Sequence, residues 1–111
     1  MTRRGAEAER RARRHYRLRG FRVLGVNVWA GGHELDLVVR RGRRLVFSEV
    51  KEKTGPRFGR PAEMVGPEKR RRLRRAAEAW LARHPELAGL EVVFEVAAVQ
   101  GRRVERIRDA A

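Results

Sequence analysis

The hydrophobic residues recur at spacings that divide the chain into helical and strand segments. Residues 5–19 carry an apolar residue at every fourth position among charged ones, at Ala8, Ala12 and Tyr16. This spacing places the three side chains on one face of a helix, and Gly20 is a suitable residue to end it. We therefore expect the chain to begin with an amphipathic helix.

Three segments with the composition of strands follow this helix. They are rich in Val, Leu and Phe and are separated by glycine-containing turns, at residues 21–29, 33–40 and 44–53. The second and third segments flank Arg41-Gly42-Arg43 and predict a hairpin. Residues 54–66 contain several glycines and prolines and predict a long irregular loop, which in a small domain is often functional.

The second half of the chain predicts another helix and one or two further strands. Pro67 suits the first position of a helix, which should end near His84-Pro85. Its apolar residues follow a helical spacing, at Leu73, Ala76, Ala77, Trp80 and Leu81. Residues 90–99 have the composition of a core strand, and residues 102–107 suit a short edge strand. This order predicts one α/β domain over residues 1–111, with a mixed sheet in which 90–99 runs parallel to the strand before the helix.

The charge of the chain points to a polyanionic partner. Its 111 residues include 28 Lys and Arg against 14 Asp and Glu, which gives a formal net charge of +14. Nearly all the cations are arginine, whose planar guanidinium group matches phosphate oxygens well. Nucleic acid is the leading partner. A biased codon supply is the alternative explanation for the arginines, and binding to a membrane surface is a weaker one, because the apolar faces are needed for the core.

The same composition excludes several classes of chemistry. The chain has no cysteine, so disulfides, thiolate zinc sites and cysteine nucleophiles are excluded. It contains no apolar run long enough to span a membrane and no signal-peptide pattern at its start. We expect a soluble, cytoplasmic protein that does not associate with membranes.

Two acidic residues interrupt the predicted core strands. Asp36 lies within Leu35–Val39 and Glu49 within Val46–Lys51, although a buried carboxylate is costly unless it is paired. Because side chains alternate along a strand, Glu49 and Lys51 share one face. A hairpin loop of two or four residues would place Asp36 on that face too, whereas a three-residue loop would place it on the opposite one.

Two carboxylates on one face predict a site for a hard divalent cation. Mg²⁺ or Mn²⁺ would offset their repulsion and retain waters, one of which could attack a phosphodiester. Lys51 could orient or deprotonate that water, or stabilise the charge that develops on the phosphate. Glu9 on the first helix offers a third carboxylate. The simpler alternative is that each acid is paired with an arginine. For Glu95 in the last core strand we expect either such a pair or a supporting position behind the metal ligands.

The spacing of these residues is similar to a known nuclease motif. Asp36 followed after twelve residues by Glu49-Val50-Lys51 resembles the PD-(D/E)XK motif of the restriction-endonuclease-like superfamily. A wider set of residues resembles the YraN family of small endonuclease-like proteins across nearly the whole chain. These residues are Ala8-Glu9-Arg10-Arg11-Ala12, Asn27, His33-Glu34-Leu35-Asp36-Leu37, Val46-Phe47-Ser48-Glu49-Val50-Lys51, Val65, Lys69 and the stretch 76–81.

This resemblance implies a fold and a set of roles. The fold would be a restriction-endonuclease-like αβββαβ core, a mixed sheet flanked by helices, similar to that of Holliday-junction resolvases. Asp36, Glu49 and the main-chain carbonyl of Val50 would bind the metal, Glu9 would complete the site, and Lys51 would be the catalytic base or stabiliser.

The leading hypothesis is therefore a Mg²⁺- or Mn²⁺-dependent endonuclease acting on DNA, including branched or junction DNA. Cationic side chains are expected to contact the phosphates, namely Arg10, Arg13, Arg57, Arg60 and Lys69. A junction resolvase needs two symmetric active sites, which a homodimer supplies. The alternatives are a nuclease fold that binds nucleic acid without cutting it, and a small RNA-associated protein of ribosomal type.

Overall fold

The computed structural model describes residues 3–53 and 66–108, with the side chains of Arg3 and Arg4 left aside. It contains, in chain order, α1 (Arg3–Leu18), β1 (Arg22–Ala30), β2 (His33–Arg41), β3 (Arg44–Glu52), α2 (Pro67–Ala82), the 3₁₀ turn η2 (Pro85–Leu87), β4 (Glu91–Gln100) and β5 (Arg103–Arg108). All the predicted helices and strands are confirmed, with ends displaced by one or two residues. The predicted loop lies almost wholly outside the described residues.

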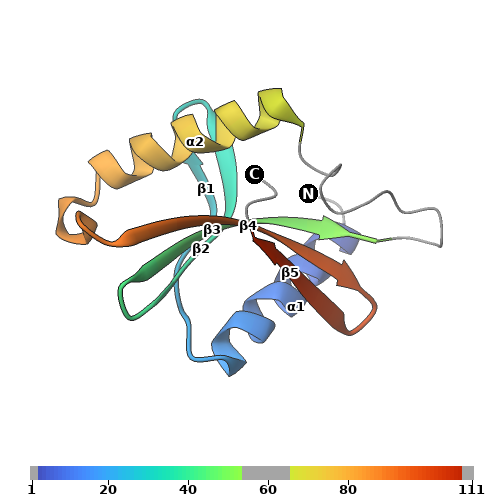
Figure 1. Ribbon diagram of the computed structural model, residues 1–111. Coiled ribbons are helices and arrows are strands. Elements are labelled where there is room, and N and C mark those ends of the chain that lie inside the picture. The colour runs from blue at the N-terminus through green and yellow to red at the C-terminus, as the bar shows by residue number, and fades with distance from the viewer. Residues whose placement is uncertain (1–2, 54–65, 109–111) are drawn as a thin grey trace.

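The five strands form one mixed sheet with helices on both faces (Figure 1). Their spatial order follows the chain from β1 to β5, and only β3 and β4 pair in parallel. The helix α2 connects these two strands, which confirms the predicted parallel pairing. Both helices have 16 residues, and in the described part of the chain neither is long and apolar enough to cross a membrane.

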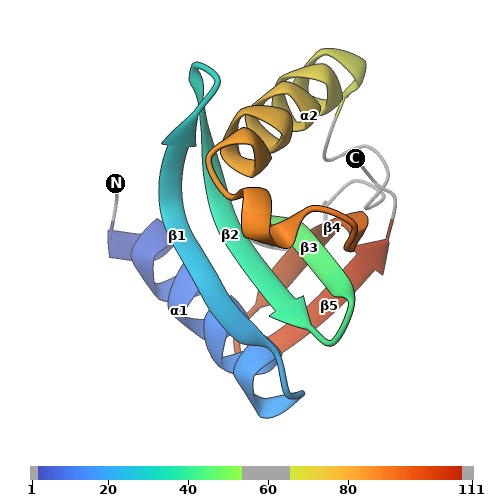
Figure 2. The ribbon, with the colours of Figure 1, turned by 90° about the vertical axis from the view of Figure 1, so that its left-hand side faces the viewer.

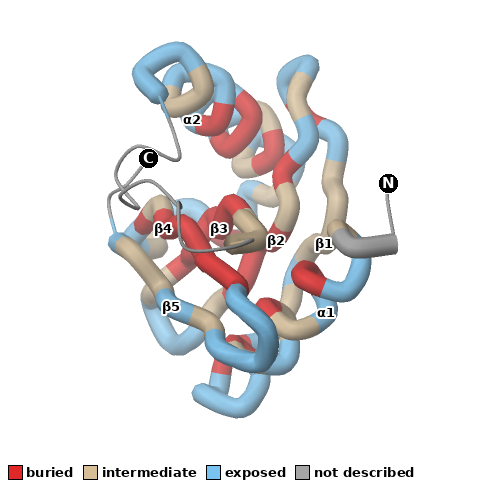
Figure 3. The backbone as a smooth tube through the Cα atoms, turned by 90° about the vertical axis from the view of Figure 1, so that its right-hand side faces the viewer, coloured by how far each residue is buried: buried red, intermediate tan, exposed pale blue. Residues whose placement is uncertain are grey.

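Each helix buries its apolar stripe against one face of the sheet. Ala8, Ala12 and Tyr16 of α1 pack on a cluster that includes Leu37 and Val46. A second cluster lies beneath α2 and is formed by its four buried residues and by strand residues such as Leu45 and Phe47, the helix residues being Leu73, Ala76, Ala77 and Trp80. Buried positions accordingly concentrate on the central strands and on the inner sides of the helices (Figure 3). Burying a large apolar side chain contributes about 1.5–3 kcal/mol, so these two clusters hold the layers together.

The β1–β2 hairpin changes from one face of the sheet to the other along its length. Val26 and the opposite Leu37 pack on the α1 side, whereas Val28 and Leu35, the next pair on the same register, pack on the α2 side. Between these pairs, Asn27 has a φ of +49° and is the only described non-glycine residue with a positive φ. The far end of the hairpin therefore rises beside α2 (Figure 2). There a Cβ on Gly31 would lie only 3.0 Å from the carbonyl oxygen of Arg75, so glycine permits this approach.

Candidate active site

The β2–β3 hairpin places Asp36 and Glu49 side by side. Gly42 and Arg43 form a two-residue connection between Arg41 and Arg44, and the pairing continues in register to Leu37 and Ser48. Asp36 and Glu49 are the next residues on the two strands. The two-residue loop thus confirms the prediction that both carboxylates share a face and excludes the three-residue alternative.

Asp36 is fixed by the neighbouring strand, although its environment disfavours its charge. Its Oδ2 accepts a hydrogen bond of 2.8 Å from the backbone N–H of Val50, which favours the ionised form. Burial and then the adjacent Glu49 have the larger effect and raise the pKa of Asp36 to about 7. Asp36 is therefore a carboxyl group that a nearby cation would ionise.

Glu49 is buried and lies between two lysines. Its side chain is 6% exposed, and its Oε1 lies 2.5 Å from Nζ of Lys69 on α2 and 3.8 Å from Nζ of Lys51. Among the described residues, its Oε2 is buried without a donor. A side-chain hydrogen bond between the carboxyl groups of Asp36 and Glu49 contributes to the raised pKa of Asp36. We call Asp36, Glu49, Lys51 and Lys69 the acid–lysine cluster. The contact with Lys69 places this cluster on the α2 side of the sheet.

The two lysines of the cluster differ in their affinity for a proton. Burial and then the neighbouring charge of Lys69 lower the pKa of Lys51. Burial also acts on Lys69, but the hydrogen bond and charge of Glu49 outweigh it and raise its pKa. Lys69 is thus the resident counter-ion of Glu49, and Lys51 is the lysine that releases a proton more readily.

Glu9 approaches the site from α1 without a complete set of partners. It is 6% exposed, and within the described part of the chain its Oε1 is buried with no hydrogen-bond partner. Burial raises its pKa, a hydrogen bond with the Asn27 side chain acts in the opposite direction, and the charges of Glu34 and Glu49 add to the rise. The charge of Glu49 in the acid–lysine cluster therefore contributes to the raised pKa of Glu9.

Arg10 and Arg13 lie beside Glu9. Together with Ala6, Glu9 and Asn27 they line a pocket of about 310 Å³ between α1 and β1. Asn27 had no assigned role before the structure placed it here. Its side chain hydrogen-bonds to Glu9, and its own Oδ1 is buried without a partner in residues 3–53 and 66–108. Two signals in the sequence pointed to it: Asn27 is among the residues that resemble the YraN family, and it is an asparagine, which tolerates a positive φ, inside a predicted strand.

The remaining predicted contact residues have different positions. Lys69 lies within the acid–lysine cluster and is partly exposed, and its predicted contact with phosphate stays a prediction. Arg57 and Arg60 lie outside the described residues. The backbone N–H of Val50 holds Asp36, and the predicted role of its carbonyl group stays a prediction.

The donor set of the cluster fits a hard divalent cation with few protein ligands. In the described ranges 3–53 and 66–108, no three His, Cys, Asp or Glu side chains converge closely enough to hold a metal ion. Mg²⁺ commonly binds through one or two carboxylates and keeps several waters. Asp36 and the unpartnered Oε2 of Glu49 supply such a pair of oxygens.

Glu95, the other acid in a core strand, has a complete set of partners. Arg106 donates to both of its carboxylate oxygens, at 2.8 and 3.0 Å, and the hydroxyl of Tyr16 donates to its Oε1 at 2.8 Å. The same hydroxyl lies 2.9 Å from Oγ of Ser48. The expectation that Glu95 is paired is confirmed, and this network contributes to the α1 side of the core.

Comparison with known proteins supports the family resemblance. The model of the uncharacterised protein family UPF0102 matches residues 8–99. The chain belongs to the UPF0102 family. A UPF0102 protein of Halorhodospira halophila is 42% identical over 107 residues, covering 96% of this chain and 85% of that protein. A relative from Xanthomonas campestris is 43% identical over 109 residues, with 96% and 89% covered.

Membership in UPF0102 confirms the resemblance to YraN-like proteins at the level of this family. The matched region begins at Ala8 and ends at Val99, so it includes every described member of the acid–lysine cluster as well as Glu9 and Asn27.

Proposed function

We propose that this UPF0102 protein is a metal-dependent endonuclease that hydrolyses phosphodiester bonds in DNA. The observation that carries the proposal is the placement of Asp36 beside Glu49, with a buried, unpartnered oxygen on Glu49 and a raised pKa on Asp36. Sites that need a cation have these properties. The net charge of +14 favours a nucleic-acid substrate.

The proposal assigns roles to the described side chains. Asp36 and Oε2 of Glu49 would hold Mg²⁺ or Mn²⁺, with the carbonyl of Val50 as a further ligand and Glu9 beyond it. When bound, such an ion lowers the pKa of its water and offsets charge on the phosphate. The backbone N–H of Val50 fixes the orientation of Asp36, and Lys69 neutralises the other oxygen of Glu49.

Lys51 is the residue for proton transfer or charge stabilisation. It shares the face of Glu49, and its pKa is lowered by burial and by Lys69. A lysine that releases its proton more readily is better suited to accept a proton from an attacking water. The fold would be the restriction-endonuclease-like αβββαβ core, and the substrate class includes branched DNA such as four-way junctions.

The test is cleavage of labelled duplex, single-stranded and four-way-junction DNA in Mg²⁺ or Mn²⁺. Asp36→Asn and Glu49→Gln should lower the rate by about 10²–10³-fold or more, and Lys51→Ala by about 10²-fold. Glu91→Gln is the matched control, because Glu91 is an exposed acid paired with Arg44 and Arg108. Equal rates in all variants, or no cleavage by the parent protein on any substrate, would contradict the proposal.

One observation favours a second candidate, a nucleic-acid-binding module that does not cut. Lys69 lies 2.5 Å from Glu49 and offsets one acid without any metal. A module of this kind would bind DNA equally well with Mn²⁺ or with chelator, and Asp36→Ala would bind as the parent does. Calorimetric titration with Mn²⁺ alone separates the two candidates, because only the endonuclease should show heat that Glu49→Ala removes.

A further inference from the structure

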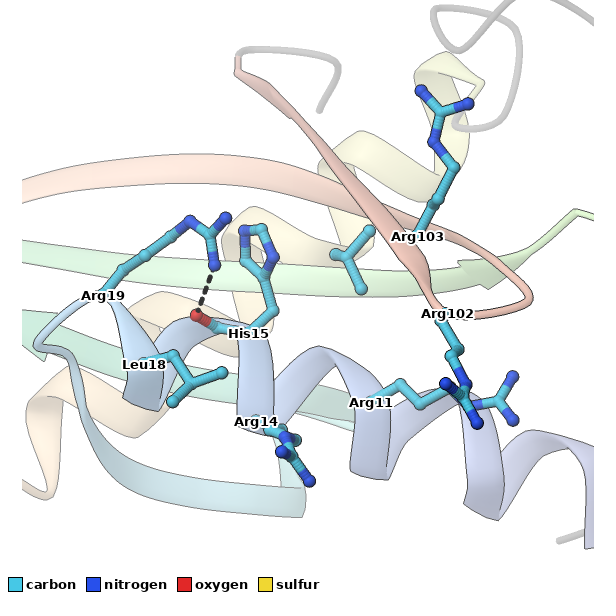
Figure 4. A pocket seen from close by; sticks show the side chains of 8 residues that line it. Arg11, Arg14, His15, Leu18, Arg19, Arg102 and Arg103 are labelled. Carbon is cyan, nitrogen blue, oxygen red and sulfur yellow. Dashed lines mark hydrogen bonds between the residues drawn. The ribbon is translucent and has the colours of Figure 1, made fainter.

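A groove lined by arginines lies between α1 and the β4–β5 hairpin, apart from the acid–lysine cluster. Its volume is about 740 Å³. Five of its eight lining residues are arginines, and the full lining is Arg11, Arg14, His15, Leu18, Arg19, Arg102, Arg103 and Val104. Figure 4 shows side chains of α1 on one side and the β4–β5 hairpin on the other, from which Arg102 points toward α1 and Arg103 points away from it. The groove contains no acidic lining residue.

Of the five arginines of this groove, two donate hydrogen bonds to backbone carbonyl groups and three are free for a ligand. Arg11 donates to the carbonyl oxygen of Gly101 at 2.6 Å, which ties the hairpin to α1. Arg19 donates to the carbonyl oxygen of His15 at 3.2 Å. Arg14, Arg102 and Arg103 are exposed and have no carboxylate or hydrogen-bond partner among the described residues.

The local electrostatics are consistent with an anionic ligand. Burial and the charges of Arg19 and Arg106 lower the pKa of His15, which therefore tends to stay neutral among the cations. The lining carries five guanidinium groups and no carboxylate, so its positive charges repel one another. A ligand carrying several phosphates would relieve this repulsion and release its own counterions.

We propose that this groove is a second nucleic-acid contact, which binds the phosphodiester backbone of duplex DNA. Duplex DNA is favoured over single strands because no Phe, Tyr or Trp lines the groove, and stacking on aromatic rings is the usual means of holding unpaired bases. Arginine forks bind phosphates in a sequence-independent manner. The inference rests on the proposed function only for the identity of the partner as DNA.

The position of the groove separates its role from that of the acid–lysine cluster. The groove is built on α1, which covers one face of the sheet, whereas the cluster contacts Lys69 of α2 on the other face (Figure 1). The two regions share no residue. The groove therefore adds affinity and retains DNA, and it takes no part in hydrolysis.

The experiment measures binding of a short fluorescent duplex by anisotropy at several salt concentrations in EDTA, where no cleavage occurs. The test variant is Arg14→Gln/Arg102→Gln/Arg103→Gln. The matched control is Arg22→Gln/Arg71→Gln/Arg75→Gln, which removes the same charge from exposed arginines outside the groove. Because each phosphate contact contributes a slope of about 0.9, the test variant should lower the salt slope by about 2–3 and weaken binding at least about tenfold at 0.1 M salt. The control variant should change the salt slope and the affinity much less.

A crosslinking measurement guards against a folding defect in the triple variant. The chain has no cysteine, so Leu18→Cys, at the rim of the groove and 72% exposed, accepts a photoreactive label at a single position. Val92→Cys, 40% exposed and outside the groove, is the control. The Leu18 label should crosslink the duplex, and the Val92 label should not.

The outcomes distinguish this inference from the proposed function. A control triple that loses as much affinity as the test triple, or equal crosslinking from both labels, would overturn the groove. The proposal would also be wrong if polyglutamate displaced the labelled duplex as effectively as unlabelled duplex does. A parent protein that does not bind duplex DNA at all would contradict it as well. If the parent protein binds duplex DNA but never cleaves it, the proposed endonuclease activity is wrong. The salt slope of the triple variant still tests whether the groove binds DNA.

Discussion

Two acidic regions on the described strands differ in how completely their charges are paired. Around Glu95, Arg106 and Tyr16 supply hydrogen bonds to both carboxylate oxygens. Around Asp36 and Glu49, two carboxylates lie together, Glu49 keeps an oxygen without a partner, and the pKa of Asp36 is raised to about 7. Both regions place acids in core strands, but of these two only the second has a carboxylate oxygen without a partner among the described residues.

This difference indicates which buried acids serve stability and which serve binding. Removing one partner of a complete network leaves the others uncompensated. Removing an acid from a crowded site relieves repulsion instead. A buried acidic region whose charges lower the stability of the fold is therefore a better candidate for function than one whose ion pairs stabilise it.

The largest expected effect comes from breaking the complete network. Glu95→Ala would leave the guanidinium group of Arg106 and the hydroxyl of Tyr16 without their acceptor in a buried setting. We expect a loss of about 3–5 kcal/mol in the free energy of unfolding, measured by urea denaturation. Glu49→Ala serves as the comparison and should cost much less, because Lys69 is partly exposed and can turn toward solvent. Equal losses in the two variants would contradict the distinction.

The next effect is a pH dependence that belongs to Asp36. Its pKa is about 7 in the folded protein against an ordinary value of 3.8, so the folded state holds this proton more tightly than the unfolded state does. The free energy of unfolding should therefore fall as pH rises from about 4 to about 7, by at most about 4 kcal/mol at 1.4 kcal/mol per unit.

Asp36→Asn removes this titration while keeping a side-chain oxygen for the N–H of Val50. The variant and the parent should have similar free energies of unfolding near pH 4. As the pH rises to 7, the free energy of unfolding of the variant should increase progressively relative to that of the parent. A stability difference that does not change with pH would show that Asp36 is ionised in the folded protein without cost.

The pairing of Asp36 with Glu49 could be predicted because it depends on local geometry. A short glycine-containing turn joins two strands, and the alternation of side chains then determines which residues share a face. The same alternation placed Lys51 beside Glu49. These residues lie within one hairpin, so their arrangement needs no knowledge of the rest of the fold.

The partners of these residues could not be predicted, because they come from distant elements. Lys69 reaches Glu49 from α2, across the segment between β3 and that helix. Tyr16 meets Glu95 from 79 residues away, and Arg106 is one of many similar arginines in the sequence. The positive φ of Asn27 likewise depends on the change of face in the β1–β2 hairpin. Spacing along a chain gives no information about which helix end or edge strand will supply a counter-ion.

A smaller effect tests the incomplete region directly. Mn²⁺ at about 100 times its dissociation constant should raise the free energy of unfolding of the parent by about 2.7 kcal/mol, because only the folded state brings Asp36 and Glu49 together. Asp36→Asn should lose most of this gain, whereas Glu91→Gln should keep it. Thermal unfolding with and without the ion provides the measurement. An equal shift in Asp36→Asn would assign the ion to other carboxylates of the chain.

The smallest effect probes one hydrogen bond of the complete region. Tyr16→Phe keeps the aromatic ring in the α1-side core but removes the hydroxyl that contacts Ser48 and Glu95, at a cost of about 1–2 kcal/mol in urea denaturation. The loss stays below that of Glu95→Ala because Arg106 still donates to both oxygens of Glu95. DNA cleavage and Mn²⁺ binding should be unchanged, since the acid–lysine cluster lies on the other face of the sheet. A Tyr16→Phe protein that loses Mn²⁺ binding would show that the two acidic regions are coupled through Ser48 and its neighbour Glu49, and the distinction between them would fail.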